Sequence, residues 1–379
     1  MVHLMPVLQW ASRVLAGLVG GLVLIGAVMQ IHRDRQNRHR IACYQGWENQ
    51  LMDYLFNGGY ERGAFGPVPR ADRWLFRDFL TRYQSTLGGQ ESEILRQLYL
   101  DLGIHASLPR RLRNRNPRVR AQAAKEIALF RLDEPSEHTL PPVAERPWRW
   151  KPGFRMDGAL DRVLPLLKDP IPFVAHAAAR TLTRSRNLRY AGPVLAWALR
   201  EKRYQRDRLL RVLEGFGPSL LPWMAENLGP PAQNPRAWVL FALLVGSHRH
   251  RESEPRLLEL LEIPDVDLRA SALKALIILA DPAVYPKTLR FVSDPAWEIR
   301  AQAVRALGVL GGPSAIPDLL PLMSDSVYEV RRNAAQSLVD LGHAGISALV
   351  WLTEDPSSDR FAQDMARERL EWADERGHP

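Results

Sequence analysis

Apolar residues recur at helical spacing along most of this chain. Two successive stripes are Ile299, Ala303, Leu307 and Leu310, followed by Ile316, Leu319, Leu320 and Met323. Prolines and glycines stand between such stripes, as in Asp294-Pro295 and Gly311-Gly312, where they end one helix and start another. No segment alternates apolar and polar residues long enough to form a strand. The pattern predicts an all-α chain made of pairs of amphipathic helices.

The helix pairs repeat about every 31 residues. The clearest copies read S-D-P-A-W-E-I-R from Ser293 and S-D-S-V-Y-E-V-R from Ser324. Equivalent positions, six of whose seven gaps are 30 to 33 residues and the first 55, are Arg120, Ala175, Arg206, Arg236, Arg269, Arg300, Arg331 and Phe361. A fixed period of this size is typical of a solenoid, in which stacked units share one continuous core. We therefore predict an α-α superhelical solenoid.

The repeats carry an aspartate six positions before the reference arginine in two units. This pattern resembles the HEAT repeat, in its short bacterial form, over about residues 108 to 372. The resemblance implies a ladder of contacts between successive repeats, formed by Asp294, Arg300, Asp325 and Arg331. Ala175 and Phe361 replace the arginine in two other units, and the central units lack the aspartate. We expect the ladder to be interrupted at those units.

The segment from Val14 to Ile31 contains no charged residue over 18 positions, close to the shortest helix that crosses a bilayer. A cleaved secretory signal is the rival interpretation. Such a signal has basic residues before the apolar run and a small-x-small site after it, whereas here most of the charge follows the run. A lipoprotein signal requires a cysteine directly after the run, and Cys43 lies too far downstream. We predict a single N-terminal transmembrane helix.

Four arginines follow the apolar segment: Arg33, Arg35, Arg38 and Arg40. The positive-inside rule then places the N-terminus outside and the solenoid in the cytoplasm, with the chain in the cytoplasmic membrane. Gly17 and Gly21 form a G-x-x-x-G pair, which favours close packing against another membrane helix, including a second copy of this chain. Chance occurrence in a glycine-rich span explains the same pair.

The sequence divides into six segments. They are a tail (1–13), the membrane helix (14–31), a basic juxtamembrane segment and linker (32–70), two capping helices (71–107), the solenoid (108–372) and a second tail (373–379). The solenoid contains a proline-rich insertion at 133–157 that holds Trp148, Arg149 and Trp150. Insertions in solenoids often lie on the binding face, and tryptophan and arginine are frequent interface anchors. The alternative is that both indoles pack on neighbouring repeats.

Charge and cysteine content narrow the choice of partner and compartment. The 379 residues carry a net charge of +9, largely from arginine, which suits acidic partners, nucleic acid or anionic lipid. Cys43 is the only cysteine, so a disulfide framework is excluded and a reducing compartment fits.

The sequence contains no recognisable catalytic signature. Neither a phosphate-binding glycine loop nor a G-x-S-x-G elbow is present. His248, His250, Glu252 and Glu254 cluster in one loop, but arginines interleave them and a solvated loop is favoured over a metal site; His176 is interpreted as a packing residue. Deoxyhypusine hydroxylases, which are HEAT-like, bind iron through His-Glu dipeptides, and this chain has none. Phycobilin lyases share the short repeat, but nothing marks a bilin site. We predict no enzyme activity, cofactor or metal.

Two functional hypotheses remain. The first is a noncatalytic, membrane-tethered adaptor that binds a membrane-associated partner protein, since solenoids provide long binding surfaces. By analogy with similar bacterial proteins, the partner could belong to a membrane-embedded machine such as that for envelope polysaccharide synthesis. The second is polyanion binding by a basic groove, as in HEAT-like DNA glycosylases, with nucleic acid or anionic lipid as ligand. It depends on whether one face holds Arg118, Arg120, Arg206, Arg208 and Arg211.

Overall fold

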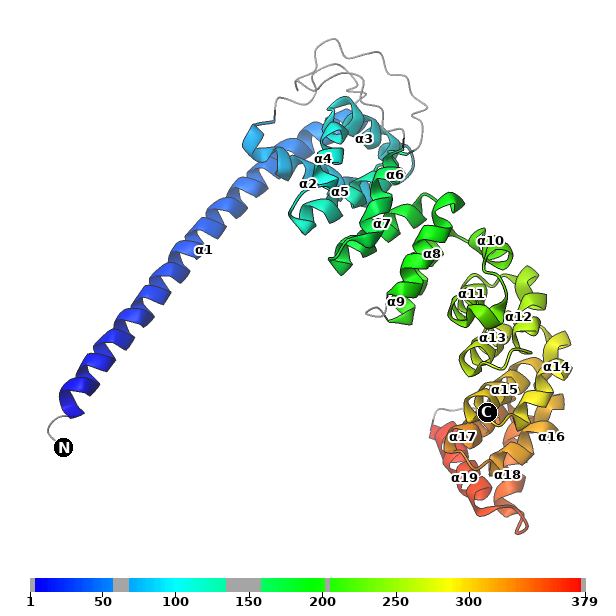
Figure 1. Cartoon of the computed structure of the whole chain (residues 1–379). Helices are drawn as coiled ribbons and strands as arrows, with labels where there is room; N and C mark the ends of the chain where they lie inside the picture. The colour runs from blue at the N-terminus through cyan, green and yellow to red at the C-terminus, as the bar shows by residue number, and fades with distance from the viewer. Residues whose placement is uncertain (1–3, 57–67, 134–157, 202–204, 376–379) are drawn as a thin grey trace. The chain divides into compact units, whose positions relative to one another are not determined.

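The computed structural model describes residues 4–56, 68–133, 158–201 and 205–375 (Figure 1). Within these ranges the chain is helical and has no strand, so the predicted all-α class is confirmed. The chain divides into two compact units, residues 1–162 (unit 1) and residues 163–379 (unit 2). Each unit is described separately.

Unit 1 begins with one long helix and continues with shorter ones. Its elements are α1 (Leu4–Phe56), η1 (Arg70–Asp72), α2 (Arg73–Thr86), α3 (Gly89–Asp101), η2 (Ile104–Ser107), α4 (Leu108–Leu112) and α5 (Pro117–Leu129), and α6 (Ala159–Val163) lies at the boundary with unit 2. The sequence suggested separate membrane and juxtamembrane helices, whereas α1 is continuous over 53 residues. The reason is that residues 32–40 contain neither proline nor glycine and so nothing interrupts the helix.

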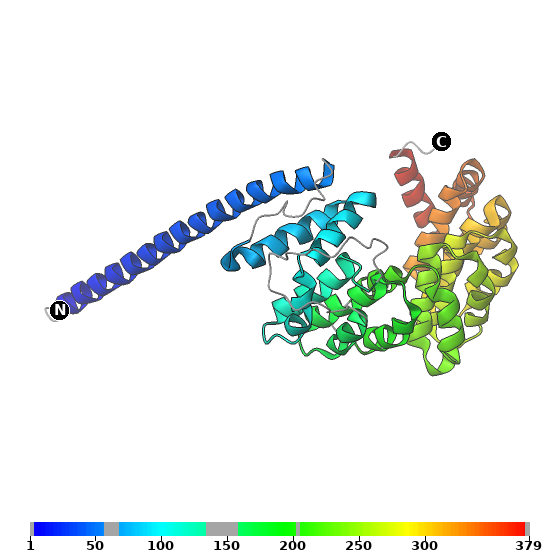
Figure 2. The same cartoon turned by 90° about the horizontal axis from the view of Figure 1, so that it is seen from above.

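Only the carboxyl-terminal part of α1 packs on the rest of unit 1, and the helix otherwise extends away from α2 and α3 (Figure 2). The Trp47 ring meets the rings of Phe76 and Phe79, with centroids 5.0 and 5.7 Å apart. Leu51 on α1 is fully buried in the same core. Trp74 does not join the apolar stripe of α2 as expected and is exposed, because the buried face of the helix starts at Leu75.

Unit 2 is a series of helix pairs. Its first elements are η3 (Leu164–Lys168), α7 (Pro172–Arg184), η4 (Leu188–Tyr190), α8 (Ala191–Arg200), α9 (Arg206–Leu213), η5 (Glu214–Phe216), α10 (Leu220–Asn227), η6 (Pro231–Gln233), α11 (Pro235–His248), η7 (Arg251–Ser253) and α12 (Glu254–Leu260). They are followed by α13 (Val266–Leu279), η8 (Pro282–Val284), α14 (Tyr285–Leu289), η9 (Arg290–Ser293), α15 (Trp297–Gly311), η10 (Gly312–Ala315), α16 (Ile316–Leu319), η11 (Leu320–Ser324), α17 (Tyr328–Asp340), α18 (His343–Glu354) and α19 (Arg360–Glu375).

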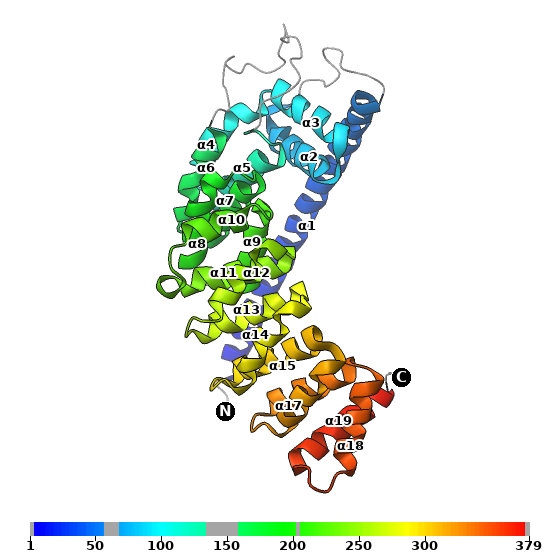
Figure 3. The same ribbon diagram turned by 90° about the vertical axis from the view of Figure 1, so that its right-hand side faces the viewer.

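The second helix of each pair stacks on the second helix of the next, in the order α11, α13, α15, α17 and α19 (Figure 3). The predicted stripe of α15 is confirmed, since Ile299, Ala303, Leu307 and Leu310 are all buried. A helical solenoid is therefore observed in unit 2. Its core lies between successive helix pairs, as the buried side chains of α15, α17 and α19 show.

The first helix of a pair is less regular than the sequence suggested. The stripe that starts at Ile316 is divided between α16 and the 3₁₀ segment η11. Pro317 and Pro321 each stand near the start of one of these pieces, and proline cannot donate the hydrogen bond that a longer α-helix needs. Leu319 and Met323 are fully buried, whereas Ile316 and Leu320 are only partly so.

Candidate functional site

A row of exposed apolar side chains crosses the second helices of unit 2. Val266, Trp297 and Tyr328 are the first residues of α13, α15 and α17 and are 39, 40 and 44% exposed. Phe361, the second residue of α19, is 62% exposed. We call these four residues the exposed row. Its members recur with the repeat, so they mark one equivalent position on neighbouring helices.

An acidic side chain follows each of the first three members of the exposed row. Asp267, Glu298 and Glu329 lie in the first turn of their helices and are exposed. A negative charge at this position is stabilised by the helix dipole. It also lines the exposed row with carboxylates, and this combination suits a partner segment that is both apolar and basic.

A ladder of contacts fixes the helices that carry the exposed row. Arg300 donates from Nε to Asp325 Oδ2 at 2.7 Å and from Nη2 to Asp325 Oδ1 at 3.0 Å. Its Nη1 donates to the backbone oxygen of Asp294 at 2.9 Å. One repeat earlier, Arg269 forms the equivalent ion pair with Asp294. One repeat later, Arg331 donates to the backbone oxygen of Asp325 at 2.6 Å. Each arginine thus joins two successive repeats.

The ladder residues are arranged differently from what the spacing of six suggested. An arginine pairs with the carboxylate of the following repeat and bonds only the backbone of the aspartate six positions before it. Arg269 therefore takes part although Ile263 stands six positions before it. At the other end, Arg331 lies over the Phe361 ring at 5.0 Å, so the ladder ends on a member of the exposed row.

Asp325 gives the ladder a defined pH dependence. Burial raises the pKa of this carboxyl, but hydrogen bonds from Arg300 and from the Val327 N–H lower it by more, so the net shift is downward. The ion pair therefore stabilises the fold fully above the ordinary aspartate pKa of about 4, and the contribution is lost as the pH falls through the folded value.

We expect Asp325→Asn to lower the stability of unit 2 by about 2 kcal/mol at pH 7, because it removes the charge from two hydrogen bonds. The variant should also lose stability less steeply than the wild type between pH 5 and about pH 2. Thermal unfolding measured over this pH range tests both points. Asp340→Asn, which alters an exposed carboxylate on α17, is the control. Equal acid sensitivity of Asp325→Asn and the wild type would contradict this role.

The arginines chosen from the sequence lie in both units. Arg118 is exposed on α5, and Arg120 donates from Nη1 to the backbone oxygens of Asn114 at 2.8 Å and Arg115 at 3.0 Å. Arg206, Arg208 and Arg211 are exposed together on α9. Because α5 belongs to unit 1 and α9 to unit 2, one shared basic groove stays a prediction.

The surroundings of Arg206 are not purely basic. Its guanidinium lies 3.7 Å from the carboxylate of Asp267. Together with Asp265, Asp267 and Arg236 it lines a cavity of about 370 Å³ between α9, α11 and α13. Arg236 donates to the backbone oxygens of Leu199 and Glu201, at 2.8 and 3.1 Å. The cavity therefore mixes both signs of charge.

Other residues chosen from the sequence are placed as follows. Trp148, Arg149 and Trp150 lie outside the described residues. Gly17 and Gly21 lie within α1, and their packing against another helix stays a prediction. His176 lies beside Trp197, with ring centroids 6.1 Å apart. His250 is hydrogen bonded through Nδ1 to Ser253 Oγ at 2.9 Å.

By length and hydropathy, one run in the described part of the chain, Trp297–Ser324, reaches the level of a membrane span, with a mean hydropathy of 1.3. This run is not one straight helix, because α15 ends at Gly311 and Gly312 takes a φ of 55° before η10, α16 and η11. Its apolar side chains, Leu307 and Met323 among them, fill the core between repeats. The run is therefore the interior of a repeat.

Sequence reasoning missed the exposed row as a site. Trp297 and Tyr328 were visible in the two clearest copies of the repeat, at the same place three residues before the ladder arginine. The signal is a bulky apolar residue repeated every 31 positions just outside the buried stripe. An aromatic residue there does not contribute to the core, and its recurrence at an exposed position indicates a binding surface.

Comparison with known proteins supports the repeat assignment. The HEAT repeats family matches residues 285–368, which contain α14 to α18 and part of α19. No characterised protein matches the chain by sequence. The C-terminal part of the chain is thus HEAT-type, in agreement with the resemblance seen in the sequence.

Several solved structures are similar in fold at low sequence identity. An engineered protein is 15% identical, with 78% of this chain and 84% of that chain covered and a TM-score of 0.34. The CpcE and CpcF complex of phycocyanin lyase from Nostoc sp. PCC7120 is 15% identical, with coverage of 71% and 94% and a TM-score of 0.26. Human deoxyhypusine hydroxylase is 16% identical, with coverage of 74% and 99% and a TM-score of 0.28.

Proposed function

We propose that this chain is a noncatalytic scaffold, tethered to a membrane by α1, that binds a basic extended segment of a partner protein along the exposed row. The observation that carries the proposal is the recurrence of Val266, Trp297, Tyr328 and Phe361 at exposed positions of neighbouring helices. A HEAT-type solenoid is compatible with such a role, because each repeat adds an equivalent binding position.

The dimensions of the exposed row favour an extended peptide. Neighbouring packed helices lie about 8–10 Å apart, so four successive positions span about 25–30 Å. An extended chain covers that length with about eight or nine residues. Tryptophan and tyrosine are the residues that most often dominate binding energy at protein interfaces. The carboxylates of Asp267, Glu298 and Glu329 favour lysine or arginine in the bound segment.

The tether is supported by the apolar surface of α1. Leu24, Val28, Met29 and Ile31 are exposed on this helix, next to four arginines that begin at Arg33. Exposed apolar side chains in such number are unfavourable in water and favourable in a bilayer. Under the positive-inside rule the arginines lie on the cytoplasmic side, where they also contact anionic lipid headgroups. The partner is then a membrane-associated protein.

A basic groove for nucleic acid is less well supported than protein binding. Arg206 lies beside Asp267, which belongs to the row of carboxylates that follows the exposed row. A phosphate backbone that approached this surface would meet these carboxylates and be repelled. Of the two hypotheses drawn from the sequence, the surface of unit 2 therefore favours the protein partner.

We expect the double replacement Trp297→Ala and Tyr328→Ala to reduce recovery of the partner about tenfold or more, because each anchor contributes on the order of 1–2 kcal/mol. The measurement is crosslinking and capture of the full chain from gently solubilised membranes, with the recovered proteins quantified. Both side chains are exposed, so the variant should unfold within a few degrees of the wild type.

Trp351→Ala is the matched control, since Trp351 is a tryptophan 56% exposed on α18, away from the exposed row. Its replacement should leave recovery unchanged. A second arm with nuclease distinguishes nucleic acid from protein. If the double variant and the control retained the same partner as the wild type, the exposed row would not be the binding surface.

A further inference from the structure

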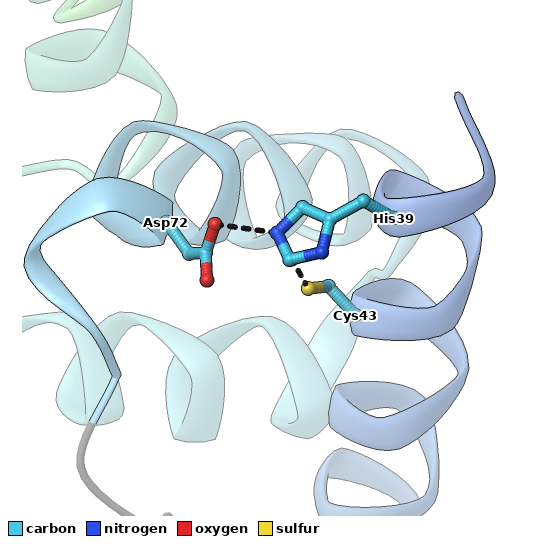
Figure 4. A group of neighbouring side chains, drawn as sticks. All are labelled: His39, Cys43 and Asp72. Atoms are coloured by element: carbon cyan, nitrogen blue, oxygen red, sulfur yellow. Dashed lines mark hydrogen bonds and ion pairs between the residues drawn. The ribbon is translucent and has the colours of Figure 1, made fainter. Parts of the chain in front are cut away.

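Three side chains of different chemistry meet where α1 approaches the start of α2. His39 and Cys43 stand four residues apart on one face of α1, and Asp72 ends η1 (Figure 4). His39 Nε2 lies 2.8 Å from Asp72 Oδ1 and 3.6 Å from Cys43 Sγ. All three candidate ligand atoms lie within 4.8 Å of one another. In the part of the chain that the structure describes, this is the one group of three such residues.

Hydrogen bonding does not account for both contacts of the imidazole nitrogen. If Nε2 carries the proton, it donates to the Asp72 carboxylate and cannot accept from the Cys43 thiol. If Nε2 is unprotonated, it accepts from the thiol but faces the carboxylate oxygen without a proton between them. A cation at the meeting point would satisfy nitrogen, sulfur and oxygen together, because each would then bind through a lone pair.

We propose that His39, Cys43 and Asp72 form a binding site for a divalent transition metal ion, with Zn²⁺ as the preferred occupant. Imidazole, thiolate and carboxylate are the three ligand types that Zn²⁺ takes in proteins. Hard ions such as Mg²⁺ and Ca²⁺ prefer oxygen ligands alone and do not fit this set.

The separations agree with tetrahedral coordination after a small adjustment. With about 2.3 Å from zinc to sulfur and about 2.0 Å to nitrogen and oxygen, sulfur and nitrogen lie about 3.5 Å apart and nitrogen and oxygen about 3.3 Å apart. The observed sulfur–nitrogen distance is 3.6 Å, and the nitrogen–oxygen distance of 2.8 Å must widen. The His39 side chain is 60% exposed and has room to make this movement. A water molecule would complete the coordination.

The neighbouring contacts explain why the ligands are held together without an ion. One turn along α1, the Tyr44 hydroxyl donates to Asp78 of α2 at 2.8 Å. Trp47 packs on Phe76 of α2, as described above. These contacts hold α1 against α2 next to the metal ligands. A bound ion would add a direct link between α1 and the residues immediately before α2, and would fix the direction in which α1 leaves unit 1.

The test uses the full, tag-free chain in detergent, stripped of metal with a chelator and titrated with Co²⁺. We expect one ion per chain and a near-ultraviolet thiolate-to-cobalt band, which Zn²⁺ abolishes by displacement. Since Cys43 is the only cysteine, such a band can come from no other residue. Zn²⁺ should also slow alkylation of the Cys43 thiol in the wild-type chain at least tenfold, a measurement that needs no variant.

Variants complete the test. Cys43→Ser should abolish the cobalt band, and Asp72→Asn should weaken Zn²⁺ binding about tenfold or more. His32→Ala is the matched control, because His32 lies on the same helix and contacts Gln36 instead, with the side-chain nitrogens 2.9 Å apart; it should bind as the wild type does. Alkylation that Zn²⁺ does not slow, Co²⁺ binding without the band, or one ion shared by two chains would overturn the site.

Discussion

Arg111→Met is expected to destabilise unit 1 by about 3–5 kcal/mol, because it leaves a buried carboxylate without its charged partner. Arg111 donates to both oxygens of Glu126, at 2.6 and 2.7 Å, and the Glu126 side chain is only 1% exposed. The fully buried Tyr99 adds a third bond from its hydroxyl to Glu126 at 2.9 Å. Burial and the negative charge of Glu126 raise the pKa of Tyr99 well above its ordinary value, so Tyr99 remains a donor.

Urea denaturation of the full chain, with hydrogen exchange in α4 and α5 as the local readout, measures this loss. The control is Glu126→Gln in the Arg111→Met background, which removes the buried charge and keeps an acceptor for Tyr99. It should recover at least half of the lost stability. Arg111→Met within about 1 kcal/mol of the wild type would mean that unit 1 rearranges or hydrates around Glu126.

Gly345→Ala is expected to cost unit 2 about 3 kcal/mol by overpacking. Gly345 is buried at the start of α18, where a Cβ atom would lie 1.8 Å from the backbone oxygen of Leu338 on α17. The obstacle is backbone and cannot turn aside as a side chain would, so α17 and α18 must separate. Thermal unfolding should show a fall of several degrees, with faster hydrogen exchange in both helices.

The matched replacement is Gly192→Ala, also in a helix of unit 2. Its Cβ would approach only the ring of Trp223, at an ordinary contact distance of 3.8 Å. This variant should be as stable as the wild type or more stable by about 0.5 kcal/mol, because alanine favours the helix over glycine. Equal behaviour of the two variants would show that α17 and α18 adjust their spacing without cost.

The helical repeats were predictable from sequence because each depends on contacts that recur. The period of 31 residues placed the Asp294-Pro295 turn between η9 and α15, and the helical spacing identified the buried face of α15. The broken first helices were less clear, because Pro317 and Pro321 were judged as helix starts one at a time. Two prolines four residues apart divide a helix that either alone could begin.

The sites outside the periodic pattern were not predictable. Asp72 contacts His39 from 33 positions away, and the distance depends on how α1 packs on α2. Glu126 appeared to be an ordinary polar residue of a helix, and only the approach of Arg111 and Tyr99 reveals that it is buried. Such contacts occur once in the chain, so no spacing announces them, whereas the ladder and the exposed row recur with the repeat.

The ladder also bears on how the length of the array can change. Arg300 completes its carboxylate pair only with Asp325 of the following repeat, so each unit offers one half of a bond at either end. A duplicated unit inserted between two others would find a waiting carboxylate on one side and a waiting guanidinium on the other. Deletion of a whole unit would rejoin its neighbours in the same way. The array is therefore able to lengthen or shorten by whole repeats while every remaining joint keeps its chemistry.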